Sequence, residues 1–321
     1  MAAAPLDETL TTLLDQFEER LVDVAVASSP FVTEAARHII NAGGKRFRPL
    51  LVFLAAQFGG EADVDDVMRA AMVMELTHVA SLYHDDVMDD ADLRRGAPSA
   101  NRLMGNSVAI LVGDFLFARA SLTVAELGVE YVSLQAETFS RLVQGQIAET
   151  KGPGEGDDPL AHYIQVIADK TGSLIAASAR FGGMVAGATP EVLDALAAFG
   201  EEVGLVFQLS DDLIDITSDK TGKTPGTDLR EGVPTLPVLM LRAENNPDDA
   251  ELLALIDGDL SSDEALAAAL AGLRAHPVLA RTRAEVERHA AIARAHLAPL
   301  PDGDAKDALL RVCADLVDRT T

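Results

Sequence analysis

The sequence predicts an all-α fold, and three observations support this class. Apolar residues recur at spacings of three and four along most of the 321 residues, as on one face of a helix, whereas strand-like alternation is nowhere sustained. Apolar residues make up 48% of the chain, but aromatic residues only 4%, and tryptophan is absent. The core must therefore be built from Ala, Leu, Val, Ile and Met, which suit closely packed helices.

The expected helices follow one another along the chain, separated by clusters of turn-forming residues. None of these breaks is a long flexible linker, so residues 1–321 are predicted to form a single domain. The break Thr221–Pro237 is long for a structureless connection, and such loops often close over a site. The clearest helical patterns are Val67–Met88, Asn101–Leu127, Val129–Glu149, Tyr163–Ala186, Glu191–Asp219, Asp248–Ile256, Ser262–Ala275, Ala280–Leu297 and Asp304–Asp318.

The charge balance and the cysteine count exclude several functional classes. With 26 basic and 51 acidic residues the net charge is −25, which would repel nucleic acid and anionic lipid headgroups. The single cysteine, Cys313, cannot form an internal disulfide. The amino-terminal residues lack a secretory signal pattern, and no run reaches about 18 uninterrupted apolar residues. We therefore expect a cytoplasmic location, no stable membrane insertion and no nucleic-acid partner.

Two similar aspartate clusters each end a strongly apolar helical pattern. They are Asp85-Asp86-Val87-Met88-Asp89 and Asp211-Asp212-Leu213-Ile214-Asp215. Residues four apart share a helix face, and like charges at that spacing destabilise a helix unless a cation compensates them. Hard carboxylate oxygens favour magnesium or calcium over zinc. A single cluster is often only a solvated helix end, but two such patches facing each other could hold a diphosphate through metal ions.

Basic residues near both clusters could contact a diphosphate directly. A Gly43-Gly44 turn precedes Lys45, Arg46 and Arg48 at the start of a helical pattern, where free N–H groups also attract anions. Taken alone, this segment could equally be an ordinary basic turn. Arg94 and Arg95 follow the first cluster, where they either bind anions or neutralise the acids.

Five further polar residues lie within the apolar patterns or in the long loop. His78 is seven residues before Asp85 and shares its helix face, although a satisfied core histidine is the plainer interpretation. Lys170, Thr171 and Gln208 lie in otherwise apolar helices and need polar partners there. Lys223 lies in the long loop, which could close over the site.

These motifs, in this order, closely resemble the trans-isoprenyl (polyprenyl) diphosphate synthase family. The resemblance runs from about Gly43 to Pro237 and implies an isoprenoid-synthase-type helical bundle around a central cavity. Any one of these motifs alone is weak evidence for the family, whereas all of them in this order are strong evidence. The matching segments are 43–49, Glu75-Leu76-Thr77-His78, 85–89 with Arg94-Arg95-Gly96, Gly113-Asp114, Lys170-Thr171, 207–212, and Gly222-Lys223 with Gly226-Thr227-Asp228.

The resemblance also implies roles for individual residues. Three magnesium ions on the allylic diphosphate would be bound by Asp85, Asp86, Asp89, Asp211, Asp212 and Asp215. The same diphosphate would be contacted by Arg94, Lys170 and Lys223, and isopentenyl diphosphate would be held by Lys45, Arg48, His78 and Arg95. Thr171 and Gln208 would lie near the developing allylic cation. The chain departs from many relatives at Val233, where they carry a lysine, so one phosphate contact is missing or supplied elsewhere.

The implied reaction is a head-to-tail condensation of isopentenyl diphosphate with an allylic diphosphate, carried out by a homodimer. The product should grow along the helix before Asp85, where short-product relatives often place an aromatic residue. Here Ser81 and Ala80 are small, followed one and two turns deeper by Thr77 and Met74. We therefore expect a product longer than farnesyl, of the hexaprenyl to decaprenyl class. Because methionine is flexible, a geranylgeranyl product is the alternative.

Three other functions share parts of this pattern. Class I terpene cyclases usually replace the second aspartate cluster with an Asn/Ser/Glu pattern and do not need Lys45 and Arg48. Head-to-head synthases of the squalene type lack the glycine–lysine start. A non-catalytic subunit of a heteromeric prenyl synthase generally loses the acidic clusters, which are both intact here.

Overall fold

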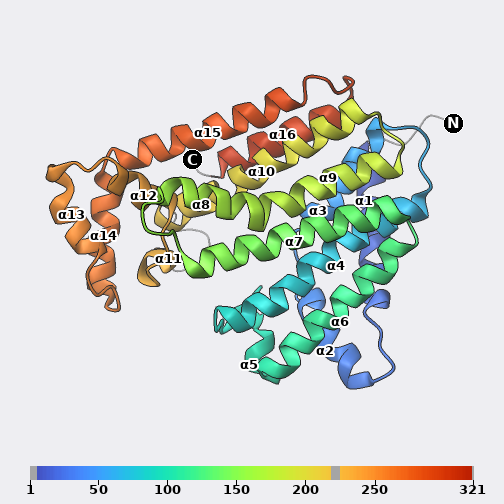
Figure 1. Cartoon of the computed structure of the whole chain (residues 1–321), viewed down its shortest axis with the longest axis horizontal. Coiled ribbons are helices and arrows are strands. Elements are labelled where there is room, and N and C mark those ends of the chain that lie inside the picture. The colour runs from blue at the N-terminus through green and yellow to red at the C-terminus, as the bar shows by residue number, and fades with distance from the viewer. Residues whose placement is uncertain (1–5, 218–224, 320–321) are drawn as a thin grey trace. The chain divides into compact units, whose positions relative to one another are not determined.

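The computed structural model describes residues 6–217 and 225–319. Within these residues nearly every regular element is a helix (Figure 1). The exception is a short antiparallel pair, β1 (Leu93–Arg94) with β2 (Ala97–Pro98), in the loop that follows the first aspartate cluster. The predicted all-α class is therefore confirmed.

The chain divides into two compact units, which we describe separately. Unit 1 comprises residues 6–140, 174–197 and 299–308, and unit 2 comprises residues 141–173, 198–217, 225–298 and 309–319. Helices α7 (Val129–Lys151), α10 (Pro190–Thr217) and α16 (Asp304–Asp318) contribute residues to both units. The expectation of a single domain stays a prediction.

Unit 1 is built around α4 (Val64–Met88), which packs against α3 (Phe47–Ala55) and α6 (Asn106–Ala125). Most α4 residues between Val67 and Tyr83 are buried, as expected for a helix that is apolar on all sides. The unit also contains α1 (Leu6–Val24), α2 (Pro30–Asn41), η1 (Ala56–Phe58), α5 (Ala100–Met104) and nearly all of α9 (Ser173–Val185).

Helix α6 approaches α4 closely at a glycine. A Cβ atom on Gly113 would lie 2.4 Å from Nε2 of His84 on α4, so no larger residue fits without a shift. The same His84 nitrogen lies 3.1 Å from the Ile110 carbonyl oxygen. His84 therefore serves the packing of these two helices.

By length and composition alone, helix α6 could also span a membrane. The sequence did not predict this, because the helix lacks a long uninterrupted apolar run. Asp114 and Arg119 interrupt its apolar sequence. Ala109, Val112 and Leu116 are buried within unit 1. Because a core helix of a soluble protein passes the same test, this finding is weak support for a membrane span.

Unit 2 surrounds the carboxyl-terminal part of α10. Leu213 and Ile216 of α10 share a buried apolar cluster with Leu229, Val238 and Leu273, which leaves the aspartates of this segment on its other faces. The pattern predicted as one helix over Tyr163–Ala186 is interrupted by a wide π-helical turn, η2 (Ala168–Gly172). The remaining elements are α8 (Pro159–Ile167), α11 (Thr227–Arg230), α12 (Leu236–Ala243), η3 (Pro247–Asp249), α13 (Ala250–Ile256), α14 (Asp263–Ala275) and α15 (Val278–His296).

Candidate active site

The first aspartate cluster lies at the carboxyl end of α4. Asp85 and Asp86 occupy its last turn, and Asp89 is the capping residue that follows the helix. This turn contains no basic residue, and the helix dipole places partial negative charge at the same end. Carboxylates here repel one another and the dipole, so the cluster favours a cation supplied from outside the helix.

Asp86 differs from its neighbours because it points into the protein. Its side chain is fully buried, and its Oδ1 accepts a hydrogen bond from Arg94 Nε at 2.6 Å. Its Oδ2 accepts one from the backbone N–H of Ala100, the first residue of α5, at 3.0 Å. Asp86 thus ties the loop after the cluster to α4 and orients Arg94; its predicted role as a metal ligand stays a prediction.

A group of basic side chains gathers near the start of α3 in unit 1. Arg46 is almost fully buried and contacts Glu75 at 2.9 Å and Glu18, so its charge is balanced. Arg48, in contrast, has a buried Nε without a hydrogen-bond partner. Burial lowers the Arg48 pKa to about 10, Glu75 opposes this shift, and Arg95 adds to it. The guanidinium of Arg48 therefore lacks the negative charge that would balance it.

His78 faces the same group of cations. Burial lowers its pKa well below the ordinary value, and the positive charges of Arg48, Arg95, Arg46 and Arg94 lower it further. The imidazole is therefore neutral at pH 7 and has hydrogen-bonding capacity for a ligand. Arg95 itself is anchored, because its Nη1 donates to the carbonyl oxygens of Ile39, at 3.2 Å, and Gly43. Lys45 is exposed on the same segment. Together these residues offer positive charge and a neutral imidazole to a ligand; their predicted role in holding a diphosphate stays a prediction.

The second aspartate cluster lies near the carboxyl end of α10 in unit 2. Asp211 Oδ1 contacts Arg319 Nη2 at 2.5 Å, and this arginine also lies over the ring of Phe207. Asp215 Oδ1 accepts a hydrogen bond from the Thr227 backbone N–H at 3.2 Å. Residues that follow the cluster in sequence thus supply positive charge and hydrogen-bond donors to it.

Asp212 is the counterpart of Asp86. It is 3% exposed, and its Oδ2 accepts hydrogen bonds from the Tyr163 hydroxyl and from the backbone N–H of Leu236 at 2.8 Å. Burial raises the Asp212 pKa to about 7, against the hydrogen bonds that favour its charged form. Leu236 is the first residue of α12, so the second aspartate of each cluster accepts a hydrogen bond from the first residue of a later helix, α5 for Asp86 and α12 for Asp212.

A cavity of about 340 Å³ in unit 2 brings four of the predicted residues together. Lys170 and Thr171 come from η2, and Gln208 and Asp212 come from α10. Lys170 Nζ contacts Glu149 Oε2 at 2.5 Å. Charged and polar side chains line the cavity together with a largely apolar surface, a combination that suits an amphipathic molecule with an anionic head. Its apolar side chains include Val166, Ile167, Leu239 and Val233.

The cavity includes functional candidates that the sequence motifs did not single out. These are Glu149, His162 and Tyr163. Tyr163 lies seven residues before Lys170, the same spacing that places His78 on the face of Asp85, so a search at that spacing could have found it. Glu149 has no such signal, because it was one acid among 51. Lys223 lies outside the described residues.

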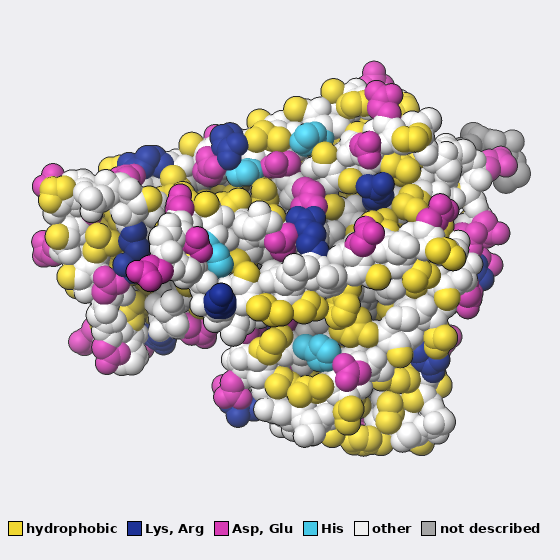
Figure 2. Space-filling view, viewed as in Figure 1, with side chains coloured by type: hydrophobic (Ala, Val, Ile, Leu, Met, Phe, Trp, Pro, Cys, Tyr) yellow, Lys and Arg dark blue, Asp and Glu magenta, His cyan; other side chains and the backbone are white. Residues whose placement is uncertain are grey.

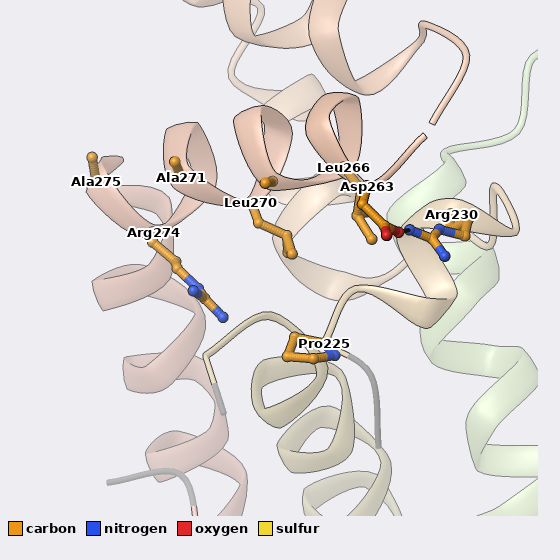
Figure 3. A pocket seen from close by; sticks show the side chains of 9 residues that line it. Pro225, Arg230, Asp263, Leu266, Leu270, Ala271, Arg274 and Ala275 are labelled. Atoms are coloured by element: carbon orange, nitrogen blue, oxygen red, sulfur yellow. Dashed lines mark hydrogen bonds and ion pairs between the residues drawn. The ribbon is translucent and has the colours of Figure 1, made fainter. Parts of the chain in front are cut away.

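A larger cavity of about 640 Å³ lies elsewhere in unit 2 (Figure 3). Leu266, Leu270 and Pro225 face it, and Arg230 pairs with Asp263 at its rim at 2.5 Å. None of the predicted site residues lines it, so its size does not identify it as the active site.

Comparison with known proteins decides the family. A model described as "Polyprenyl synthetase" matches residues 29–273. The chain belongs to the polyprenyl synthetase family. A nonaprenyl diphosphate synthase of Mycobacterium tuberculosis is 49% identical over 305 residues, which cover 94% of this chain and 90% of that protein. The family predicted from the ordered motifs is therefore confirmed.

Solved structures agree with this family assignment. A geranylgeranyl pyrophosphate synthase from Corynebacterium glutamicum, complexed with calcium and isoprenyl diphosphate, has a TM-score of 0.90 at 44% identity, over 99% of this chain and 98% of that chain. A decaprenyl diphosphate synthase from Rhodobacter capsulatus has a TM-score of 0.87 at 30% identity, over 98% of each chain. The isoprenoid-synthase-type fold is therefore confirmed, and the chain is a prenyltransferase.

The donor set of this family member fits a hard divalent cation. Among the residues in 6–217 and 225–319, no three Asp, Glu, His or Cys side chains converge enough to hold a metal alone. Magnesium sites often use one or two carboxylates and complete their coordination with waters and substrate phosphates. Both clusters offer only carboxylate oxygens, at helix ends without a basic residue in the last turn. This chemistry suits magnesium held between protein and diphosphate.

The raised pKa of Asp212 predicts how stability changes with pH. The folded protein keeps a proton that the unfolded chain releases between about pH 4 and pH 7, so the free energy of unfolding falls as pH rises through this range. Asp212→Asn is expected to flatten this part of the profile and to stabilise the metal-free protein at pH 8 by up to a few kcal/mol. Thermal unfolding in EDTA from pH 5 to pH 8.5 measures this. Equal pH profiles for parent and variant would contradict it.

Proposed function

We propose that this chain is an all-trans polyprenyl diphosphate synthase that adds isopentenyl diphosphate head-to-tail to an allylic diphosphate. The observation that carries the proposal is the cavity on which Lys170, Thr171, Gln208 and Asp212 converge. It combines cationic and carboxylate groups for a diphosphate head with apolar walls for a prenyl tail. Two intact aspartate clusters favour this function over a terpene cyclase or a non-catalytic subunit of a heteromeric synthase.

The reaction requires the protein to stabilise a leaving diphosphate and to keep water away from an allylic cation. Lys170, Arg94 and Lys223 would bind the allylic diphosphate, while Thr171 and Gln208 would lie near the developing cation. Magnesium, as three ions by family resemblance, would supply positive charge to the leaving group when bound to the aspartate clusters. Preorganised charge of this kind is usually a large catalytic term.

The second substrate would be held in unit 1. Lys45, Arg48, His78 and Arg95 form a cationic group in which Arg48 lacks a balancing acid, so a diphosphate would supply the missing negative charge. The alkene of isopentenyl diphosphate would attack the cation, and the released diphosphate would accept the proton that is lost. No dedicated side-chain base is needed for this sequence of steps.

A product longer than farnesyl is the length we propose, in the hexaprenyl to decaprenyl class. Ala80 and Ser81 on α4 precede Asp85 by about one turn and present little volume, and Thr77 and Met74 lie deeper on the same helix. Eleven residues of helix extend about 16 Å, which leaves room for several isoprene units. The relative at 49% identity carries the name nonaprenyl diphosphate synthase, which supports this range.

A geranylgeranyl product is the second candidate. The solved structure at 44% identity is a geranylgeranyl pyrophosphate synthase. Met74, the deepest of the four α4 residues along the predicted path, could stop the growing product at that length. Incubation with labelled isopentenyl diphosphate, magnesium and each of the three short allylic primers decides between the lengths. Products that stop at four isoprene units would select this candidate, and no incorporation at all would contradict the proposed function.

Ala80→Phe is expected to shorten the product by several isoprene units, because the ring would occupy the path predicted along α4. Chromatography of the products, beside the parent and Ala80→Ser, measures the distribution. Ala80 is fully buried, so the thermal midpoint is recorded for each variant to separate a blocked path from poor folding. An unchanged product distribution from a folded variant would contradict the path.

We further propose that the protein works as a homodimer in the cytoplasm. Unit 1 exposes several large apolar side chains on α5, α6 and the start of α7, and apolar surface gathers over α6 in Figure 2. Exposed apolar patches of this kind often mark interaction sites. The residues are Leu103, Ile110, Leu111, Leu122, Val129 and Val132. Light scattering of Leu111→Asp against the parent tests the dimer; an unchanged mass would contradict this interface.

A further inference from the structure

Lys170 and Thr171 lie in a helical turn that is unusual. Residues 168–172 form a π-helical turn, in which the Ser173 backbone N–H bonds to the Ala168 carbonyl oxygen five residues earlier. Such turns are rare, often occur at functional sites, and persist because the surrounding structure holds them in place. The position of both side chains in the cavity therefore depends on whatever holds this turn.

Two neighbouring helices approach the turn at backbone distance. A Cβ atom on Gly145 of α7 would lie 2.7 Å from the Lys170 backbone nitrogen. A Cβ atom on Gly204 of α10 would lie 2.5 Å from the Gly172 Cα atom. The turn is thus confined between α7 and α10, and the glycines permit this closeness but supply no attraction of their own.

Arg141 supplies the attraction. From α7, its Nε donates to Asp169 Oδ1 at 2.6 Å, inside the turn, and its Nη1 and Nη2 donate to the Glu201 carboxylate on α10, the latter at 3.1 Å. Its Nη2 also lies 3.4 Å from the carbonyl oxygen of Ala168, the first residue of the turn. One guanidinium therefore joins α7, the turn and α10.

Asp169 and Glu201 need the positive charge of Arg141 between them. Glu201 Oε2 lies close to the turn, since a Cβ atom on Gly172 would be 3.1 Å from it. Without a cation between them, Asp169 and Glu201 would repel each other and push the turn away from α10. Gln165 Nε2 also donates to Asp169 Oδ2, at 2.8 Å, but an amide cannot neutralise the charge.

We propose that Arg141 is a positioning residue that holds the π-turn, and with it Lys170 and Thr171, at the distance from α10 that catalysis requires. Arg141, Asp169 and Glu201 do not line the cavity, so any effect of Arg141 acts through the turn. The catalytic part of this inference rests on the proposed function, because it assigns Lys170 to the allylic diphosphate.

The test compares Arg141→Met and Arg141→Lys with a control, Arg242→Met. Arg242 is similarly exposed, pairs with Asp257 and also lies in unit 2, but it does not contact the turn. Hydrogen exchange of the amides of residues 168–173 is measured on the ligand-free proteins. We expect Arg141→Met to speed this exchange at least tenfold and Arg242→Met to leave it unchanged.

Steady-state kinetics then test the catalytic consequence. Arg141→Met is expected to lower kcat about 10- to 100-fold and to raise the KM for the allylic primer, while the KM for isopentenyl diphosphate stays within twofold. Arg141→Lys keeps the positive charge but cannot donate to Asp169 and Glu201 at the same time as a guanidinium does. Its kcat and its KM for the primer should therefore lie between those of the parent and of Arg141→Met. Unchanged exchange in the turn overturns the proposal whether or not the parent is a prenyl synthase. Faster exchange with unchanged kinetics also overturns it, whereas an inactive parent would contradict the proposed function alone.

Discussion

Replacing Asp85 or Asp211 by alanine is expected to lower turnover by roughly 10³-fold, comparable to the loss of a major electrostatic contributor in other enzymes. Each residue is the first carboxylate of its cluster, towards the carboxyl end of a helix, where the helix dipole adds partial negative charge. Without it, magnesium and diphosphate would lose a ligand that the remaining residues cannot replace. The double variant should have no measurable turnover.

The measurement needs a control that separates lost ligation from lost folding. Asp65→Ala removes an exposed acid from the opposite end of α4, so it should keep turnover within a few fold. Magnesium with inorganic diphosphate should raise the thermal midpoint of the parent and of this control, because a ligand that binds only the folded state stabilises it. It should raise the midpoints of Asp85→Ala and Asp211→Ala much less. Normal turnover in the double variant would disprove the arrangement.

Helix geometry specifies which aspartates of a cluster share a helix face, but not what surrounds the second aspartate of each cluster. The spacing of four places Asp85 with Asp89 and Asp211 with Asp215, and this follows from helix geometry alone. The same geometry cannot show what surrounds Asp86 and Asp212. Their partners, Ala100 and Leu236, are 14 and 24 residues away in sequence, across loops whose paths no local pattern specifies.

Most helices were predictable because their apolar periodicity is strong, whereas two interruptions were not. Helix α5 ends before Gly105, whose φ of 80° breaks the pattern predicted as one helix from Asn101 to Leu127. The π-turn at residues 168–172 has no glycine or proline at its start, so the usual signals of a helix interruption do not reveal it. It depends on contacts with Gly145 and Gly204, which are 25 or more residues distant from Lys170. Tertiary contacts of this kind are outside the reach of local sequence patterns.

Arg48→Met and Arg46→Met are expected to change stability in opposite directions, although the two residues are two positions apart. Folding lowers the pKa of Arg48 to about 10, so its charged form is disfavoured in the folded state at pH 7. Removing that charge should raise the free energy of unfolding by about 1–2 kcal/mol. Arg46 is paired with Glu18 and with the buried Glu75, so its removal leaves a buried carboxylate poorly balanced and should cost about 3 kcal/mol.

The cost of Arg48→Met should appear instead in substrate binding. If the unbalanced guanidinium is kept for a diphosphate, its loss should raise the KM for isopentenyl diphosphate about 10- to 100-fold, as expected for one charge-assisted contact. The KM for the allylic primer should change little, because we assign Arg48 to isopentenyl diphosphate and not to the primer. Urea unfolding and initial rates on the same preparations test both effects. An Arg48→Met protein that is less stable than the parent, or one with an unaltered KM for isopentenyl diphosphate, would mean that the charge of Arg48 is balanced within the protein and is not reserved for a substrate.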